Sequence, residues 1–202
     1  MNITFQSWMQ AVWMSLIEPA EMAARVLGMR FSREAMWLAL ALVAVLNVIL
    51  LAVVQIVSPA PLIMQEQMIA LSPFAYAAII GSFLTFLVFM LVHAGRMVGG
   101  TGTLDGALML IVWFQAISLT LETIQVGLLM ISPGVAALFG MISLGAIIWV
   151  FVHFINVLHG FANFGKAIAV IVLALIATAL GTGVVMGMLG ISAPVGLSLI
   201  HI

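Results

Sequence analysis

The chain of 202 residues contains no cysteine and very little charge. Without cysteine, disulfides and metal sites built from thiolates are excluded. Charged residues make up 5% of the sequence, and the formal net charge of −1 leaves no basic face for nucleic acid. Hydrophobic residues make up 66%, and the mean hydropathy is +1.39. No water-soluble domain of this length has enough interior to bury so much hydrocarbon, so we predict a membrane protein.

Five apolar stretches are long enough to cross a bilayer as helices, which takes about 20 residues each. We predict the spans at about 36–57, 73–93, 106–131, 135–158 and 167–190. The expected fold class is therefore all-α, a polytopic membrane protein with five transmembrane helices in one membrane domain, 35–191. Residues 1–34 form a cytoplasmic or interfacial segment before it, and 192–202 a short external tail. Residues 197–202 resemble a translated sequencing-adaptor fragment, so we assign no function to His201.

All basic residues fall in gaps that would share one side of the membrane. Arg25, Arg30 and Arg33 precede the first span, Arg96 lies between the second and third, and Lys166 lies between the fourth and fifth. Because Lys and Arg near span ends stay in the cytoplasm, we predict a cytoplasmic N-terminus and an external C-terminus. A short, loop-poor, cysteine-free chain is typical of bacteria, so the expected location is a bacterial inner membrane.

Residues 5–29 repeat apolar side chains at helical spacing, with polar side chains between them. This pattern predicts an N-terminal amphipathic interfacial helix with Trp8 and Trp13 at headgroup depth. An anchor helix packed along the bundle is the alternative, and the pattern leaves both open. Pro19 is expected to break the helix, because the residue before a proline is pushed away from helical dihedral angles. Ser32 is expected to cap the helix that enters the membrane.

Polar side chains inside the predicted spans are the candidates for a functional site, because they are costly in hydrocarbon. Four of them recur on the third span at intervals of three and four residues and so share one helical face. Two more lie on the fourth span. The candidate intramembrane polar cluster comprises Gln115, Ser118, Glu122, Gln125, His153 and Asn156. These residues could line a shared interior, although Glu122 lies toward the outer half of its span and His153 toward the cytoplasmic end of its own.

Three interpretations of this cluster remain open. The first is hydrogen bonding between helices, which contributes about 0.6 kcal/mol per contact. The second is a substrate or proton pathway, since a carboxylate and an imidazole can exchange protons near neutral pH. The third is a metal or catalytic centre, but His153 and His159 are six residues apart and point to different sides of a helix. We therefore predict no catalytic residues, no metal site, no cofactor and no enzyme activity.

Small residues in the fifth span indicate close helix packing. Gly181, Gly183 and Gly187 include a Gly-x-x-x-Gly pair, which lets another backbone approach. The partner helix could belong to the same chain, to a second copy or to another membrane protein. Residues 99–104 form a Gly-rich turn that is not followed by a Lys-Ser/Thr pair, so nucleotide binding is not expected there.

The pattern resembles the Yip1-domain family of integral membrane proteins over about residues 5–190. The resemblance rests on the five spans, the interior proline of 17–19, the Gly-rich turn 99–104 and the stretch 159–167 before the last span. Eukaryotic members are associated with Rab GTPases and early secretory traffic through contacts that include a soluble N-terminal region. This chain has almost no such region, so that function is not carried over. The compact form is similar to the bacterial branch, and the family supplies no catalytic residues.

We therefore predict a non-enzymatic membrane protein that acts by protein or lipid interaction, in scaffolding or sorting. Its expected partners are the lipid bilayer and an unidentified membrane protein or a second copy of the chain, with no nucleic acid. The alternative is a small transporter or ion-coupled carrier that uses the intramembrane Glu122. A water-accessible cavity that reaches Glu122 would favour the carrier, and a dry, fully hydrogen-bonded Glu122 would favour the scaffold.

Overall fold

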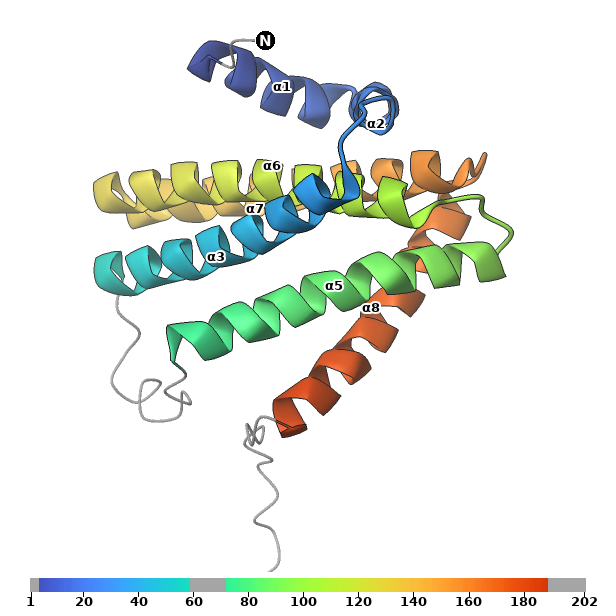
Figure 1. Ribbon diagram of the computed structural model, residues 1–202. Coiled ribbons are helices and arrows are strands. Elements are labelled where there is room, and N and C mark those ends of the chain that lie inside the picture. Colours follow the sequence, from blue (N-terminus) through green and yellow to red (C-terminus); the bar gives the residue numbers. More distant parts are fainter. Residues whose placement is uncertain (1–3, 59–71, 189–202) are drawn as a thin grey trace, which may run out of the picture.

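The computed structural model describes residues 4–58 and 72–188, and within them the chain forms seven helices and no strands (Figure 1). Five of these helices are long and apolar enough to cross a membrane, which confirms the predicted fold class. They are α3 (Arg33–Val57), α5 (Pro73–Met97), α6 (Leu104–Ile131), α7 (Pro133–His159) and α8 (Phe164–Met188). The predicted tail 192–202 and the last two residues of the fifth predicted span lie outside the described residues.

The ends of the long helices follow from local side-chain chemistry. The hydroxyl groups of Ser32, Ser72, Thr103 and Ser132 each accept a hydrogen bond from a backbone N–H in the first turn of the helix that follows. The cap predicted at Ser32 is thereby confirmed. Gly160 ends α7 in the left-handed conformation, with φ of 64°, which glycine adopts without strain.

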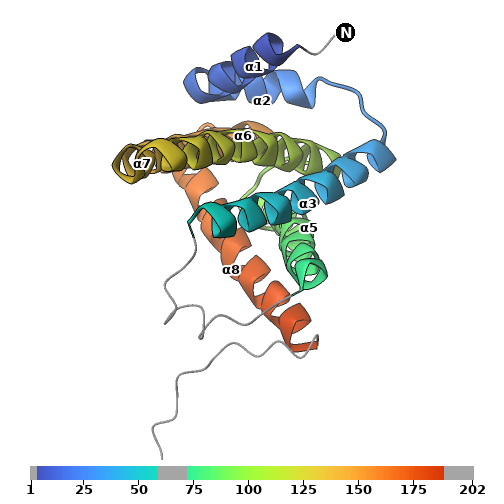
Figure 2. The same ribbon diagram turned by 90° about the vertical axis from the view of Figure 1, so that its left-hand side faces the viewer.

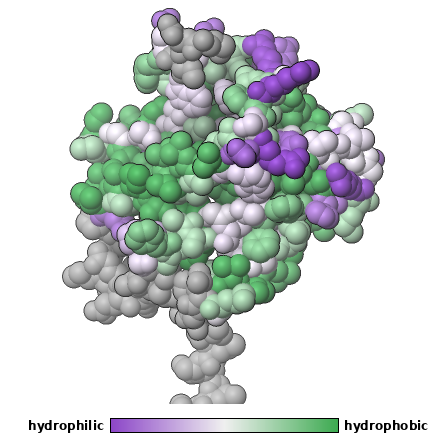
Figure 3. All heavy atoms as spheres, in the orientation of Figure 1, coloured by the Kyte–Doolittle hydropathy of each residue, from purple (hydrophilic) through white to green (hydrophobic). Residues whose placement is uncertain are grey.

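The long helices form a bundle from which one helix departs. α6 and α7 are antiparallel neighbours joined at Ser132, and α3 packs against α6 and α5. α8 packs mainly against α5 and slants away from the other helices (Figures 1 and 2). In the space-filling view, hydrophobic residues dominate the side where α3 ends, and hydrophilic residues gather where α5 ends and α6 begins (Figure 3). This second end is the predicted cytoplasmic end.

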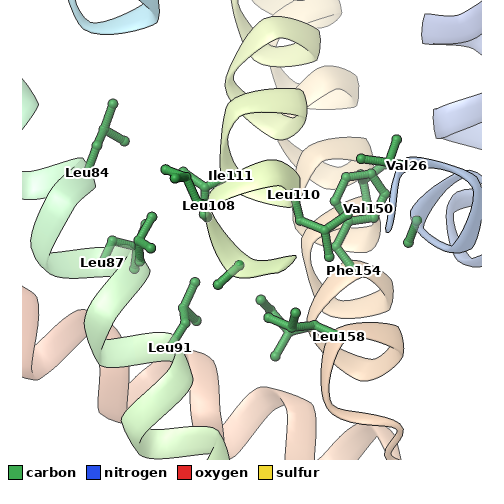
Figure 4. Close-up of a cluster of buried hydrophobic side chains, with 14 of the residues drawn as sticks. Val26, Leu84, Leu87, Leu91, Leu108, Leu110, Ile111, Val150, Phe154 and Leu158 are labelled. Atoms are coloured by element: carbon green, nitrogen blue, oxygen red, sulfur yellow. The ribbon is translucent and has the colours of Figure 1, made fainter. Parts of the chain in front are cut away.

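The best-packed part of the core lies in the half of the bundle near the predicted cytoplasmic end (Figure 4). Side chains from α2, α5, α6 and α7 converge there, and each is almost completely buried. They include Val26, Leu84, Leu91, Leu108, Leu110, Ile111, Val150 and Phe154. This packing fills the centre of the bundle between α5, α6 and α7 with apolar side chains.

Residues 5–27 form two helices that meet at Glu18, as predicted from Pro19: α1 (Phe5–Ile17) and α2 (Pro19–Leu27). α2 is amphipathic and leaves Glu21 and Arg25 exposed. It lies across the bundle (Figure 1), and Leu27 reaches Gly106 in the first turn of α6. This position agrees with the interfacial alternative for α2.

α1 follows the other alternative, because it packs along the bundle. The Trp8 indole N–H donates to the Thr120 hydroxyl at 3.2 Å, and the Trp113 indole N–H donates to the Ser15 hydroxyl at 3.1 Å. The two indole rings meet edge to face with centroids 5.6 Å apart. Thr120 lies sixteen residues into α6, or about 24 Å along its axis. Trp8 therefore lies beside the membrane-spanning part of α6 and not at the headgroup depth expected from its sequence pattern.

Candidate functional site

A cavity of about 550 Å³ lies at the end of the bundle where α6 turns into α7. Its wall is largely apolar, and the polar side chains that line it are Asn47, Glu122 and Gln125. Asn47 donates its amide to the Val43 carbonyl oxygen at 2.7 Å. Glu122 is exposed and makes no hydrogen bond or ion pair with any residue that the structure describes. The arrangement is a carboxylate and two amides in an apolar setting, which suits binding of a cation or a polar group.

Apolar side chains border the cavity on the side toward the predicted cytoplasmic end. Ile80 of α5 still lines the cavity, but Leu84, one turn further along α5, is only 1% exposed. Leu108 and Ile111 of α6 are also buried, nearer the start of that helix (Figure 4). Buried apolar side chains therefore lie between the Glu122 cavity and the predicted cytoplasmic end of the bundle.

Glu122 and His153 do not come together. His153 lies six residues from the end of α7 and Glu122 lies eighteen residues from the start of α6. Because these two helices are antiparallel, the residues differ by about 18 Å along the helix axes. The His153 Nδ1–H donates to the Trp149 carbonyl oxygen at 2.8 Å, and its ring lies between those of Trp149 and Phe164.

The rest of the candidate polar cluster is divided in the same way. Gln125 joins Glu122 at the cavity, whereas Gln115, Ser118 and Asn156 are not among its lining residues. Ser118 is 6% exposed, and the side-chain oxygen of Asn156 is buried. The six residues predicted as one cluster therefore do not form one site, because the two polar stripes lie at different depths. A functional role for any of them stays a prediction.

Sequence reasoning overlooked His159 as the centre of a polar contact at the predicted cytoplasmic end. Its ring lies against three glycines, and a Cβ atom built on Gly95, Gly100 or Gly102 would overlap it. The backbone N–H of Gly102 donates to His159 Nδ1 at 3.1 Å, and the N–H of Thr101 donates to the His159 carbonyl oxygen at 3.2 Å. In the sequence, this contact could have been predicted from the glycines of the turn 99–104 and the His-Gly pair at the end of α7. The contacts of His159 with these glycines connect the turn between α5 and α6 to the end of α7, where the turn to α8 begins.

The three glycines of α8 do not share one environment. A Cβ atom on Gly181 would lie 3.3 Å from the Phe86 ring of α5, so Gly181 permits close packing within the chain. Gly183 and Gly187, which form the Gly-x-x-x-Gly pair, face open space. Among the described residues, no three His, Asp or Glu side chains gather where they could hold a metal ion.

A comparison with known protein families matches residues 13–186 to the Yip1 domain. The match begins inside α1, ends inside α8 and includes most of all five long helices. No curated protein and no solved structure matches the chain. The family match agrees with the resemblance found in the sequence, and because it extends over much more than half of the residues, this chain belongs to the Yip1 domain family.

Proposed function

We propose that this protein acts by binding other components of a bacterial inner membrane, as a scaffold or in sorting, and not by catalysis. Membership of the Yip1 domain family supports a membrane-associated, non-catalytic role. Several interior polar groups bond one helix to another or to their own helix, such as the Trp8–Thr120 and His153–Trp149 contacts. These groups serve helix packing and do not converge on a reaction centre.

One observation carries the proposal: α1 leaves polar side chains uncovered at membrane depth. Gln6 and Gln10 are exposed, and neither amide makes a hydrogen bond within the described part of the chain. The neighbouring Trp8 contacts Thr120, near the middle of α6. An amide that faces hydrocarbon without a hydrogen bond is costly, so this face of α1 is expected to be covered by a partner. The Gly183 and Gly187 face of α8 is the second proposed contact surface.

The test is site-specific photocrosslinking in native membranes. A photoreactive residue is placed at Gln10 on α1 and at Val184 on α8, which is 64% exposed. Leu138 and Ile142 of α7, 65% and 72% exposed, are the matched control positions on a face with no proposed partner. We expect discrete protein adducts from Gln10 or Val184 and none from the controls. If all four positions gave lipid adducts and no protein adducts, the proposal would be contradicted.

A small ion-coupled carrier is the second candidate, and the cavity at Glu122 is the observation that favours it. In this function the Glu122 carboxylate would bind a proton or cation from the external side. The apolar packing below the cavity would have to open for transfer to the cytoplasmic side.

Carbodiimide labelling of vesicles across a range of pH tests this candidate. A carrier predicts rapid, pH-dependent labelling that is lost in Glu122→Gln and unchanged in Glu21→Gln, which alters an exposed carboxylate on α2. The flux of protons or cations into proteoliposomes should also be lower with Glu122→Gln than with the unsubstituted protein. If the folded protein is not labelled and labelling returns on denaturation, Glu122 is shielded from water by the membrane or a partner, and the carrier is excluded.

A further inference from the structure

A polar cavity of about 460 Å³ lies at the predicted cytoplasmic end, between the segment that joins α2 to α3 and the first turn of α6. Arg30 and Arg33 contribute charged side chains to it, and Thr101, Thr103 and Asp105 line the side toward α6. None of these residues belongs to the Glu122 cavity. The cavity therefore forms a second, separate hollow at the opposite end of the bundle.

An apolar cavity of about 300 Å³ adjoins it. The two cavities share the lining residues Met29, Phe31, Met36 and Met109. Beyond them the apolar part is lined by Val26, Ala35, Ala39, Val112 and Trp113. Trp113 lies nine residues into α6, so the groove reaches about 14 Å from the start of that helix. Because the two cavities share four lining residues, we infer that they act as one amphipathic groove, polar at the predicted cytoplasmic end and apolar toward the middle of α6.

The charge at the polar end is positive. Arg33 makes a bidentate pair with Asp105, with Nε–Oδ1 at 2.9 Å and Nη2–Oδ2 at 3.0 Å, so these two charges offset each other. Arg30 makes no ion pair with any described residue. Arg30 is thus left as the uncompensated charge at the polar end, where it can bind an anionic group.

We propose that this groove binds one anionic phospholipid of the cytoplasmic leaflet, with its phosphate at Arg30 and one acyl chain along Ala35, Ala39 and Val112. The order of polar and apolar surface along the groove is the order within a phospholipid. Phe31 and Ala35 are exposed at its side, so a chain can enter from the membrane. A basic pocket between helices at the cytoplasmic side is the type of site that holds acidic headgroups. The inference rests on the proposed function and names one ligand class for it.

Native mass spectrometry of the purified, delipidated full chain tests the site, by titration with phosphatidylglycerol and phosphatidylcholine of identical acyl chains. Arg30→Gln removes the uncompensated charge, and Ala39→Leu fills the apolar part of the groove. Arg25→Gln and Ala41→Leu are the matched controls, because Arg25 lies on the exposed face of α2 and Ala41 is exposed on α3, and neither lines the groove. The thermal midpoint of each variant shows whether it is folded.

We expect phosphatidylglycerol to bind about fivefold more tightly than phosphatidylcholine, because one arginine near an anionic headgroup contributes a factor of that order. Arg30→Gln should abolish this preference, and Ala39→Leu should weaken binding of both lipids. Equal binding of the two lipids, or an Arg30→Gln variant that behaves like Arg25→Gln, would overturn the site. If the site fails while the Gln10 crosslinks persist, the proposed function stands. If both fail, the proposed function fails as well.

Discussion

The absence of a side chain at Gly95 permits a close contact between α5 and His159. The His159 ring lies against the bare backbone of α5 at this position, and it also accepts a hydrogen bond from Gly102. His159 is 2% exposed, so neither contact is replaced easily by water. A single imidazole therefore connects the ends of α5 and α7 with the turn before α6.

Gly95→Ala should destabilise the protein, because the new methyl group would overlap the His159 ring. Overpacking of this kind costs about 1–3 kcal/mol. The measurement is the free energy of unfolding in detergent micelles. Gly145→Ala on α7 is the matched control, since a Cβ there meets no atom within 4 Å. The control should be neutral or slightly stabilising, and an equal loss in both variants would contradict a specific role for the His159 contact.

The Arg33–Asp105 pair is predicted to contribute little to stability. Its side chains are 66% and 47% exposed, and water and salt screen exposed pairs strongly. Arg33→Ala and Asp105→Asn should each leave the thermal midpoint in detergent nearly unchanged, at low and high salt alike. A large, salt-dependent drop in either variant would show that the pair holds α3 to α6.

At the scale of elements, α1 and α2 come from one amphipathic stretch of sequence but occupy different positions on the bundle. α2 lies across the predicted cytoplasmic end, whereas α1 runs along α6 through the Trp8 and Trp113 contacts. Pro19 allows the change of direction, because the chain leaves helical geometry at Glu18, with φ of −124° and ψ of 59°. The break separates α1, which contacts the middle of α6, from α2, which contacts the start of α6.

Single-cysteine labelling measures this difference directly, and the cysteine-free sequence makes it specific. In inside-out vesicles, a membrane-impermeant maleimide should label Glu21→Cys on α2 and leave Gln10→Cys on α1 unlabelled, because α1 is shielded at membrane depth. Both should react after denaturation in detergent. Equal labelling of the two native variants would place α1 in the aqueous phase and remove the argument for a partner on its face.

At the scale of the whole molecule, charge and hydrophobicity define the two ends of the bundle. All five basic residues belong to the end where α5 and α7 finish, together with the proposed lipid groove. The Glu122 cavity lies at the other end. An orientation with the basic end in the cytoplasm is a proposal that follows from the distribution of Lys and Arg.

Cysteines in the two short turns should show opposite accessibility in sealed vesicles. Asn163→Cys, before α8, is expected to react with an impermeant maleimide in inside-out vesicles only, and Gly134→Cys, after the α6–α7 turn, in right-side-out vesicles only. Both positions are exposed, and neither lies in the packed core. The reverse pattern would invert the predicted topology and place the Arg30 groove in the external leaflet.

Local chemistry determined the features that the sequence alone predicts. The five spans follow from the length of apolar runs, the break at Pro19 from its effect on the preceding residue, and the cap at Ser32 from its hydroxyl group. None of these depends on a distant partner. The resemblance to the Yip1 domain family could be found in the sequence for the same reason, since it rests on short sequence segments and their order along the chain.

Only the tertiary structure decided which polar residues meet. Helical periodicity places Glu122 and Gln125 on one face, but the rotation and depth of α6 against α7 decide that His153 lies about 18 Å away along the axis. His159 meets Gly95 and Gly102 across more than fifty residues of chain. Trp8 finds Thr120 across a still longer separation. Contacts of this kind depend on how whole helices pack, which the order of residues within one helix does not specify.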